Sequence, residues 1–486
     1  MSVRFAMITD VHYSLRQTVQ NPSRCVDIAL HLFRRAIEYL NIRGGIDLVC
    51  VGGDLLNCPE EQELLSDIQS VLERSIAPTL VIPGNHDPKP ERFYQTIKYQ
   101  NYVDVKGVRF IPFVDEERAG YNAFRSVEQI ERGRKLCHDF AGPKVFLQHV
   151  PLCPKEVVSS YKYLNASEMI PHLKEDGVVM CLSGHEHRGI KMIEKDGCTF
   201  AVEKSLCDAP FVFTIFTLNE DGSVEREPIQ LQLPNDVDYS DYHTHSAFAY
   251  CNQNVDPVIE SRLMDVLHLG HVAVTEHTRH LYLREEQCRA LNSSWYRKGF
   301  ADASAKDNRT AAFLQYMKEQ QMRDPRFISG VEVDVAASGE IIMRSDLRDN
   351  VKLRIGAIHA MSDGGDHPGK KFIFLCRHLF EDAQVRILAH PFRIFAWSKI
   401  GAVPVDSFAE LIALMKKYNV AAEINFHKNT PNPKFFQMCL ESGVKIALGS
   451  DTHNLYELGF FNPHFDFLKS IGFSGDLNDI LFDAQC

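Results

Sequence analysis

The sequence predicts a soluble α/β protein built from two unlike domains. Short apolar runs that end in His, Asp, Asn or Glu recur along the chain, and stretches with helical periodicity separate them. A polar, proline-containing segment at 233–240 divides two halves that share no sequence similarity. The 486 residues exceed what one typical core accommodates. We therefore place the domains at residues 1–235 and 236–486.

The first half alternates short strands with helices. Each apolar run is rich in β-branched residues and stops at Gly, Pro or a polar cluster, as a buried strand does. Helical periodicity is found at 24–42 and 60–74, and residues 219–223 (NEDGS) are typical of a hairpin turn. The strand and motif segments are 4–10, 47–54, 79–87, 144–151 and 178–187. Because parallel strands end at one edge of a sheet, we expect these polar ends to meet.

The second half repeats the same pattern seven times, at 242–246, 272–278, 328–335, 354–361, 385–393, 420–427 and 445–453. Helical periodicity lies between some of these segments, for example at 311–322 and 407–418. Seven strands that alternate with helices, with polar residues at one end, predict a closed or nearly closed parallel barrel.

Composition excludes several classes of protein. The net charge of −11 argues against an extended nucleic-acid surface, because such surfaces are basic. No apolar run approaches the roughly 18 residues that cross a bilayer, and the first ten residues do not form a signal peptide. The thirteen cysteines are scattered, unlike those of a secreted disulfide scaffold. We expect a cytoplasmic protein with no membrane partner; the sequence carries no sign of its oligomeric state.

Five motifs follow one another in the first half: Asp10-x-His12, Gly52-Gly53-Asp54, Gly84-Asn85-His86-Asp87, His149 and Gly184-His185-Glu186-His187. Two divalent ions about 3.5–4 Å apart can clamp a phosphoryl group, and they need a bridging carboxylate with mixed His and oxygen ligands. The motif series resembles that of the calcineurin-like metallophosphoesterases over roughly residues 1–235. The resemblance implies a four-layer α/β/β/α sandwich.

The same resemblance assigns roles to these residues. Asp54 would bridge two metals, and the catalytic His86 would act on the oxygen of the leaving group. Asn57 stands where some members have an Asp that orients this His, so we expect a different support for His86. Arg188 is either a phosphate contact or an ordinary solvated side chain. The first metal would have the ligands Asp10, His12, Asp54 and His187, and the second Asp54, Asn85, His149 and His185.

The second half carries its own series: His243-x-His245, Glu276-His277, Glu332, His359, His390 and Asp451-x-His453. This series resembles the polymerase and histidinol phosphatase (PHP) family over roughly residues 239–486 and implies a distorted (β/α)7 barrel. By resemblance, one metal would have His243, His245, Glu332 and Asp451 as ligands. Glu332 would bridge to a second metal with His359 and His390, and His277 and His453 would belong to a third.

Two positions depart from the pattern of that family. Glu276 stands where many members have the shorter Asp. Cys251 stands where some have a His, and two readings are open: it completes the third metal site as a thiolate, or it is a small core residue. For phosphate contact we favour Arg393, beside His390, over Arg279, for which a structural role is the alternative.

These observations predict a bifunctional, metal-dependent hydrolase of phosphodiesters, cyclic phosphates and phosphomonoesters among small metabolites or nucleotides. Hydroxide activated by metal would attack phosphorus, with two ions in the first site and two or three in the second. Manganese, iron and zinc all suit these ligands. Two other hypotheses are an enzyme that processes nucleic-acid ends, and a single catalytic domain with a metal-stabilised regulatory partner.

Overall fold

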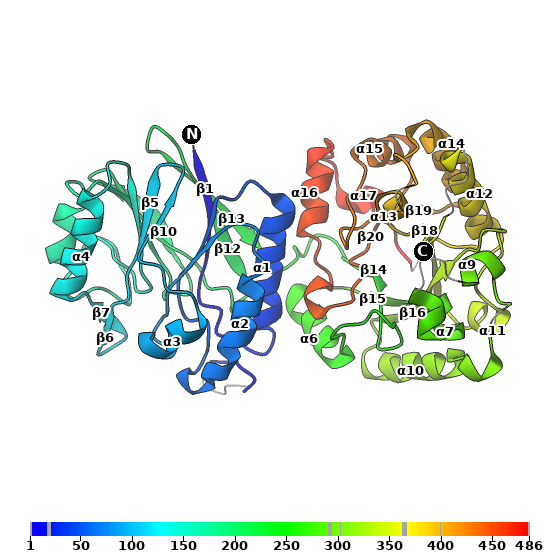
Figure 1. Ribbon diagram of the computed structural model, residues 1–486, viewed down its shortest axis with the longest axis horizontal. Coiled ribbons are helices and arrows are strands. Elements are labelled where there is room, and N and C mark those ends of the chain that lie inside the picture. The colour runs from blue at the N-terminus through cyan, green and yellow to red at the C-terminus, as the bar shows by residue number, and fades with distance from the viewer. Residues whose placement is uncertain are drawn as a thin grey trace. The chain divides into compact units, whose positions relative to one another are not determined.

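The computed structural model describes residues 2–16, 21–289, 294–301, 303–361, 367–398 and 400–484. The chain forms two compact units, Met1–Gln232 and Leu233–Cys486. The first runs from blue to green in Figure 1 and the second from green to red. In the described part of the chain, no helix combines the length and apolar character needed to span a bilayer.

The first unit contains a five-stranded sheet with the order β13-β12-β1-β2-β3. Strands β1, β2 and β3 run parallel, while β12 is antiparallel to β1 and β13 to β12. The expected hairpin turn joins β12 to β13, with Asn219 N donating to Ser223 O at 2.9 Å. The strands are β1 Val3–Ile8, β2 Leu48–Val51, β3 Thr79–Val81, β12 Val212–Leu218 and β13 Val224–Gln230.

A six-stranded sheet with the order β10-β11-β9-β8-β5-β4 forms the other half of this unit. Its strands are β4 Val103–Val105, β5 Val108–Pro112, β8 Lys144–Leu147, β9 Val178–Ser183, β10 Ile190–Lys195 and β11 Cys198–Val202. A separate hairpin pairs β6 Glu116–Arg118 with β7 Asn122–Phe124. This hairpin lies between β5 and β8 in the sequence.

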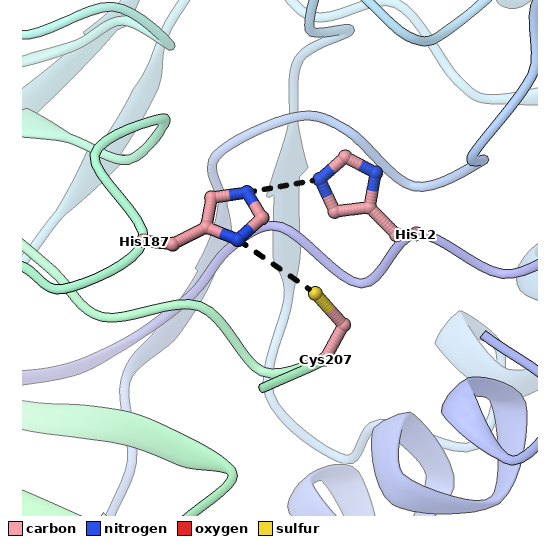
Figure 2. A group of neighbouring side chains, drawn as sticks. All are labelled: His12, His187 and Cys207. Carbon is pink, nitrogen blue, oxygen red and sulfur yellow. Dashed lines mark hydrogen bonds between the residues drawn. The ribbon is translucent and has the colours of Figure 1, made fainter. Parts of the chain in front are cut away.

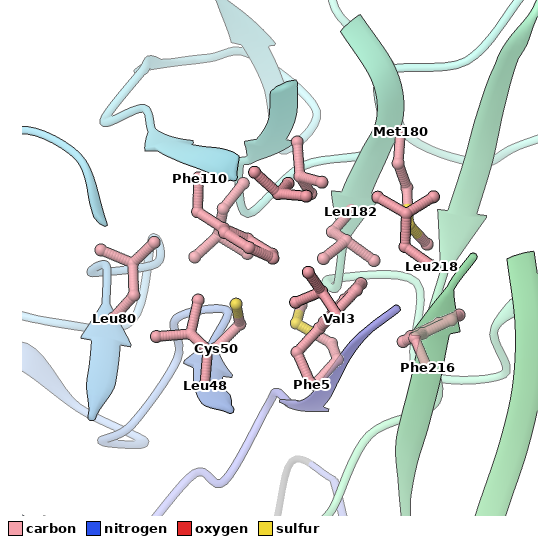
Figure 3. Packing of buried hydrophobic residues seen from close by; sticks show 14 of the residues in the cluster. Val3, Phe5, Leu48, Cys50, Leu80, Phe110, Met180, Leu182, Phe216 and Leu218 are labelled. Carbon is pink, nitrogen blue, oxygen red and sulfur yellow. The ribbon is translucent and has the colours of Figure 1, made fainter. Parts of the chain in front are cut away.

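Apolar side chains from both sheets meet in one buried cluster (Figure 3). Phe5 of the first sheet and Phe110 of the second lie edge to face with ring centroids 5.0 Å apart. Because alternate side chains of a strand point to opposite faces, each sheet gives one face to this core and the other to helices. The two sheets therefore form the middle layers of the unit.

Helices cover the outer faces of both sheets. Tyr39 of α1 contacts Phe213 of β12, with ring centroids 5.7 Å apart, and α2 packs beside α1. On the other side, Leu136 of α4 and Met169 of α5 share a buried cluster with Phe146 of β8. The helices are α1 Ala29–Arg43, α2 Leu65–Leu72, α3 Pro90–Thr96, α4 Val127–His138 and α5 Ala166–Met169, with short 3-10 turns at Pro59–Leu64 and Ile170–His172.

The second unit contains one seven-stranded parallel sheet in sequence order, β14 to β20. A parallel bridge joins Thr244, at the end of β14, to Thr452 after β20, so the sheet is nearly closed into a barrel. The strands are β14 Asp241–Thr244, β15 Val272–His277, β16 Phe327–Asp334, β17 Leu353–Ala357, β18 Ile387–Leu388, β19 Ala421–Ile424 and β20 Ile446–Leu448.

Helices alternate with these strands. The stretches at 311–322 and 407–418 form α10 and α14, close to the predicted bounds. The helices are α6 Pro257–Leu267, α7 Thr278–Tyr282, α8 Glu285–Arg289, α9 Ser294–Lys298, α10 Thr310–Arg323, α11 Ser345–Arg348, α12 Pro368–Glu381, α13 Arg393–Ser398, α14 Phe408–Tyr418, α15 Pro433–Ser442, α16 Asn462–Ser470 and α17 Leu477–Ile480, with 3-10 turns at Ala305–Asp307, Val405–Ser407 and Leu455–Glu457.

Candidate metal centres

The loops that follow β1, β2, β3, β8 and β9 carry the first set of predicted ligands. Four of these residues have a left-handed backbone, with φ of 56° at Asp10, 52° at His12, 53° at Asp54 and 66° at His185. A non-glycine residue in this region costs about 1–3 kcal/mol, and such strain is concentrated at functional sites. The surrounding fold therefore holds these side chains in one place.

The glycines beside these residues allow two loops to come together. Gly53 has φ of 95°, and a Cβ built on it would lie 2.7 Å from Gly84 N. A Cβ on Gly84 would lie 2.2 Å from Oδ1 of Asp54. The GGD and GNHD motifs therefore need glycine because their backbones approach each other and the Asp54 carboxylate so closely.

The first group of donor atoms comes from Asp10, His12, Asp54 and His187. His12 Nε2 lies 3.2 Å from His187 Nε2 and 3.5 Å from Asp54 Oδ2. Asp10 Oδ1 lies 3.6 Å from His187 Nε2. Figure 2 shows His12 and His187 with ring nitrogens directed at each other, and Cys207 Sγ lies 4.0 Å from His187 Nδ1.

The second group comes from Asp54, Asn85, His149 and His185. Asp54 Oδ2, already in the first group, lies 3.2 Å from His149 Nε2. That nitrogen also lies 3.2 Å from Asn85 Oδ1 and 3.0 Å from His185 Nδ1. One carboxylate oxygen thus touches both groups, which is the geometry expected of a bridging ligand.

Burial keeps part of this cluster neutral. It lowers the pKa of His12 well below its ordinary value, and together with the nearby His149 it lowers the pKa of His185 to about 3. Burial acts in the same direction on His149, but the Asp54 carboxylate outweighs it and raises the pKa of His149 to about 10. Neutral imidazoles and ionised carboxylates are the forms that bind divalent cations, so His12 and His185 fit such ions as they stand, and His149 would release its proton on binding one.

The second nitrogen of each ligating imidazole is also held. His149 Nδ1 donates to Gly52 O at 2.8 Å, and His185 Nε2 donates to Tyr121 O at 3.0 Å. His187 Nδ1 lies 2.5 Å from Asp208 Oδ2. These contacts fix each ring and direct its other nitrogen to the cluster. Sequence reasoning missed Asp208 and Tyr121, because neither belongs to a motif.

His86 has a main-chain support in place of a carboxylate. Its Nδ1 lies 2.9 Å from Asn57 O, and its backbone N–H donates to Asp54 Oδ1 at 2.8 Å. Arg24, which sequence reasoning also missed, places Nη1 3.2 Å from Asn57 Oδ1 and 3.4 Å from His12 Nδ1. The cluster therefore has a guanidinium beside it, whereas Arg188 is exposed.

Asp87, the last residue of the GNHD motif, joins two loops. Its carboxylate accepts hydrogen bonds from Leu55 N, Leu56 N and Gly84 N at 2.8–3.1 Å. Burial and the nearby Asp54 raise the pKa of Asp87 to about 7. Asp87 thus positions the loop of Asp54 against the loop of Asn85.

The second unit brings its predicted ligands together as well. His243 Nε2 lies 3.5 Å from Glu332 Oε1 and 3.5 Å from Asp451 Oδ1, while His245 Nε2 lies 2.9 Å from Asp451 Oδ1. Glu332 Oε1 also lies 2.9 Å from His390 Nε2 and 3.4 Å from His359 Nε2. Glu332 therefore lies between the two groups of donor atoms, as expected for the bridging role predicted for it.

Four buried atoms of this cluster have no hydrogen-bond partner among the described residues: His243 Nε2, His245 Nδ1, His277 Nδ1 and Glu332 Oε2. The last two lie in direct contact with each other, in a geometry that does not make a hydrogen bond. A buried polar atom left unsatisfied costs about 1–3 kcal/mol. All four belong to predicted metal ligands, and a bound cation would satisfy His243 Nε2, which lies 3.5 Å from oxygens of both Glu332 and Asp451. The donor set of the second unit therefore fits metal ions.

A third group lies beside this cluster. His453 Nε2 is 2.9 Å from Cys251 Sγ, which is 3.5 Å from His277 Nε2. Cys251 is exposed, so the alternative that it is a core residue is wrong. Cys251, His277 and His280 also place donor atoms within 4.8 Å of one another, and sequence reasoning missed His280.

Glu276 supports its neighbours. Its Oε2 accepts from Ser246 N at 3.1 Å and from Ser246 Oγ at 2.7 Å, while Oε1 lies 3.7 Å from His245 Nδ1. Two more carboxylates hold ligating rings: Glu423 Oε1 lies 2.7 Å from His243 Nδ1, and Asp334 Oδ1 lies 2.7 Å from His359 Nδ1. Sequence reasoning gave neither acid this role.

The two arginines predicted to contact phosphate differ. Arg393 donates to Asp451 and places Nη2 2.6 Å from His390 Nε2, and its guanidinium lies 4.5 Å from the ring of Trp397. Arg279 is buried and donates to both oxygens of Asp334 at 2.8 Å. Arg393 thus lies within the donor set, whereas the contacts of Arg279 favour the structural alternative.

Residues 3–189 match the family model of the calcineurin-like phosphoesterases. A comparison with curated proteins finds no match. Among solved structures, a dimetal phosphatase from Danio rerio is 12% identical with a TM-score of 0.39, and the alignment covers 47% of this chain and 98% of that one. A purple acid phosphatase from yellow lupin (Lupinus luteus) seeds is 16% identical with a TM-score of 0.36, covering 47% and 52%. A 5'-nucleotidase precursor from Thermus thermophilus is 13% identical with a TM-score of 0.29, covering 47% and 54%.

Proposed function

We propose that this protein, a metal-dependent phosphoester hydrolase whose N-terminal part is a calcineurin-like metallophosphoesterase domain, catalyses two separate hydrolytic reactions. The position of Asp54 supports the first reaction most directly, because its Oδ2 lies 3.5 Å from His12 Nε2 and 3.2 Å from His149 Nε2. The substrates are small phosphorylated metabolites or nucleotides, and the net charge of −11 disfavours an extended nucleic-acid surface.

In the first unit, two divalent cations would supply electrostatic stabilisation of the phosphoryl oxygens and a water acidic enough to form hydroxide near neutral pH. His86 is oriented by the bond between its Nδ1 and Asn57 O. When protonated, it donates the Nε2 proton to the oxygen of the leaving group. Arg24 adds positive charge beside His12, where a phosphate oxygen can accept from it.

The second unit is proposed to be a PHP-like phosphoesterase domain over residues 236–486. Its nearly closed seven-stranded sheet and its cluster of unsatisfied ligand atoms support this assignment. Two or three ions would occupy it, and the mixture of His, carboxylate and thiol donors suits zinc, iron or manganese. Arg393 would contact the phosphate.

The two reactions form a sequence in this proposal. The first unit opens a phosphodiester or cyclic phosphate, and the second removes the phosphomonoester that results. A cytoplasmic location belongs to the same proposal, and the scattered arrangement of the thirteen cysteines supports it.

A panel of nucleotides and sugar phosphates assayed with the metal-loaded full chain tests the proposal. His86→Ala should abolish diester cleavage, and His390→Ala should abolish monoester release. If one substitution removes both activities, the two sites are not independent. If His390→Ala changes neither, the second unit is a metal-stabilised regulatory domain.

A further inference from the structure

A cavity of about 290 Å³ opens beside the cluster of predicted metal ligands in the first unit. Asn85 and His149 line it and also belong to that cluster. The other walls come from the loop after β3, the end of β5 and the β6–β7 hairpin. The volume lies near the lower limit of small-molecule sites, roughly 300–1,000 Å³, so the cavity suits one compact group.

The walls of this cavity are mainly apolar. Proline rings and aromatic side chains offer flat apolar surfaces, which favour planar ligands. The residues that form this surface are Pro83, Pro88, Pro90, Phe113, Val114 and Ala123. Phe113 and Ala123 are buried, so the wall they form is already packed from behind.

The charges around the cavity do not favour a second phosphate. Arg125 donates to both oxygens of Asp115 at 2.8 and 2.9 Å, so this carboxylate is neutralised from behind the wall. Among the described lining residues, Lys89 is the one lysine or arginine, and Glu117 on the hairpin has the opposite charge. Both side chains are exposed. The described lining has no arginine, whose paired donors would hold a phosphate.

A hydrogen bond connects the cavity lining to one of the predicted metal ligands. His185 Nε2 donates to the carbonyl of Tyr121, a lining residue on the turn of the β6–β7 hairpin, at 3.0 Å. Among the described residues His86, the proposed donor to the leaving oxygen, does not line the cavity. Its ring lies 4.8 Å from that of His12 in the first donor group, whereas Asn85 and His149, which line the cavity, belong to the second group. A substrate group bound in the cavity is therefore part of the ester that stays on phosphorus after hydrolysis.

We infer that this cavity binds a flat, uncharged organic group carried by the retained ester of a phosphodiester substrate. The inference rests on the proposed function of the first unit and adds a substrate class to it: diesters with an aromatic or nucleobase-sized group on the retained oxygen. Hydrolysis of such a diester breaks the P–O bond to the leaving group, and the retained aryl monoester is the product.

Two diesters with the same leaving group test the inference. Bis(4-nitrophenyl) phosphate and methyl 4-nitrophenyl phosphate both release 4-nitrophenolate and differ only in the retained ester. Ala123→Met fills the cavity, and Ala119→Met, at an exposed position of the same hairpin, is the matched control. We expect Ala123→Met to lower kcat/KM for the bis-aryl ester about tenfold. The methyl ester, and both esters with Ala119→Met, should change less than about twofold.

Binding of phosphonates gives a readout that does not depend on turnover. Titration calorimetry with manganese-loaded protein should show phenylphosphonate binding about tenfold more tightly than methylphosphonate, and Ala123→Met should remove this difference. Equal affinity for the two phosphonates, or an equal loss for both esters in Ala123→Met, overturns the inference. Failure of the wild-type protein to hydrolyse either ester instead contradicts the proposed function.

Discussion

His187 Nδ1 lies 2.5 Å from Asp208 Oδ2, so this imidazole of the first donor group is fixed by a carboxylate from a different loop. Ser205 Oγ donates to the same oxygen at 2.9 Å. The contact directs His187 Nε2 towards His12 and strengthens it as a ligand. Asp208 is therefore a positioning residue.

Replacing this carboxylate tests that role. Asp208→Asn should weaken manganese binding to the first unit by about 10–100-fold, because the imidazole loses its anionic partner. Titration calorimetry on the full chain measures the affinity. Asp221→Asn, in the exposed β12–β13 turn, is the control and should leave it unchanged. Unaltered affinity in Asp208→Asn would show that the contact does not tune the metal.

His86→Ala separates catalysis from metal binding. The side chain of His86 is not a predicted ligand, and its ring is held by Asn57 O. We expect kcat for diester cleavage to fall by about 10²–10⁴-fold, because the leaving oxygen loses its proton donor. Metal content measured by elemental analysis should stay at the wild-type value, and a matching loss of metal would assign His86 to the coordination sphere.

Arg24→Met tests the guanidinium beside His12. A charged hydrogen bond to phosphate contributes about 1.5–3 kcal/mol, so KM for the diester should rise at least about tenfold while metal content is unchanged. Arg188→Met is the matched control at an exposed position. If the control raises KM and Arg24→Met does not, the phosphate contact belongs to Arg188.

Glu332→Gln tests whether the second cluster is independent. Glu332 Oε1 lies within 3.5 Å of His243, His359 and His390, so the amide should cost the second unit its ions. We expect about two or three fewer metal ions per chain. Monoester release should disappear, while the manganese dependence of diester cleavage stays as in wild type. Retention of all ions would remove Glu332 from the ligand set.

The sequence predicted which candidate ligands lie together because each belongs to a local pattern. A strand followed at once by His or Asp places that residue at the carboxyl edge of a parallel sheet, whatever the order of the strands. The DxH and HxH pairs needed only the two-residue repeat of extended chain. Neither prediction required knowledge of which strands are neighbours.

The supporting residues were not predictable in this way. Asp208, Asp334 and Glu423 are single acids. Each lies more than twenty residues in sequence from the histidine that it contacts, and only tertiary packing brings the two together. The sequence also did not predict where two of the helices begin. The stretch at 24–42 becomes helical only from Ala29, and 60–74 begins with a 3-10 turn. These outcomes depend on packing, which overrides propensity.

The last prediction concerns pH and the side chain of Glu260 in α6. This carboxyl is buried, its Oε1 has no hydrogen-bond partner among the described residues, and burial followed by the nearby Asp241 raises its pKa from 4.5 to about 8. Between these two values the unfolded chain loses its proton while the folded chain keeps it. The contribution of Glu260 to the free energy of unfolding is therefore fully present below pH 4.5 and is lost as the pH rises to 8.

Glu260→Gln should remove this dependence, because the amide stays neutral at every pH. The Tm of the variant should exceed that of wild type most clearly above pH 8 and much less at about pH 5. Calorimetric scans at both pH values measure the difference. Glu410→Gln, on the exposed face of α14, is the control and should shift Tm equally at the two pH values. A Tm difference for Glu260→Gln that does not grow with pH would mean that the buried carboxyl ionises in the folded protein as readily as it does in water.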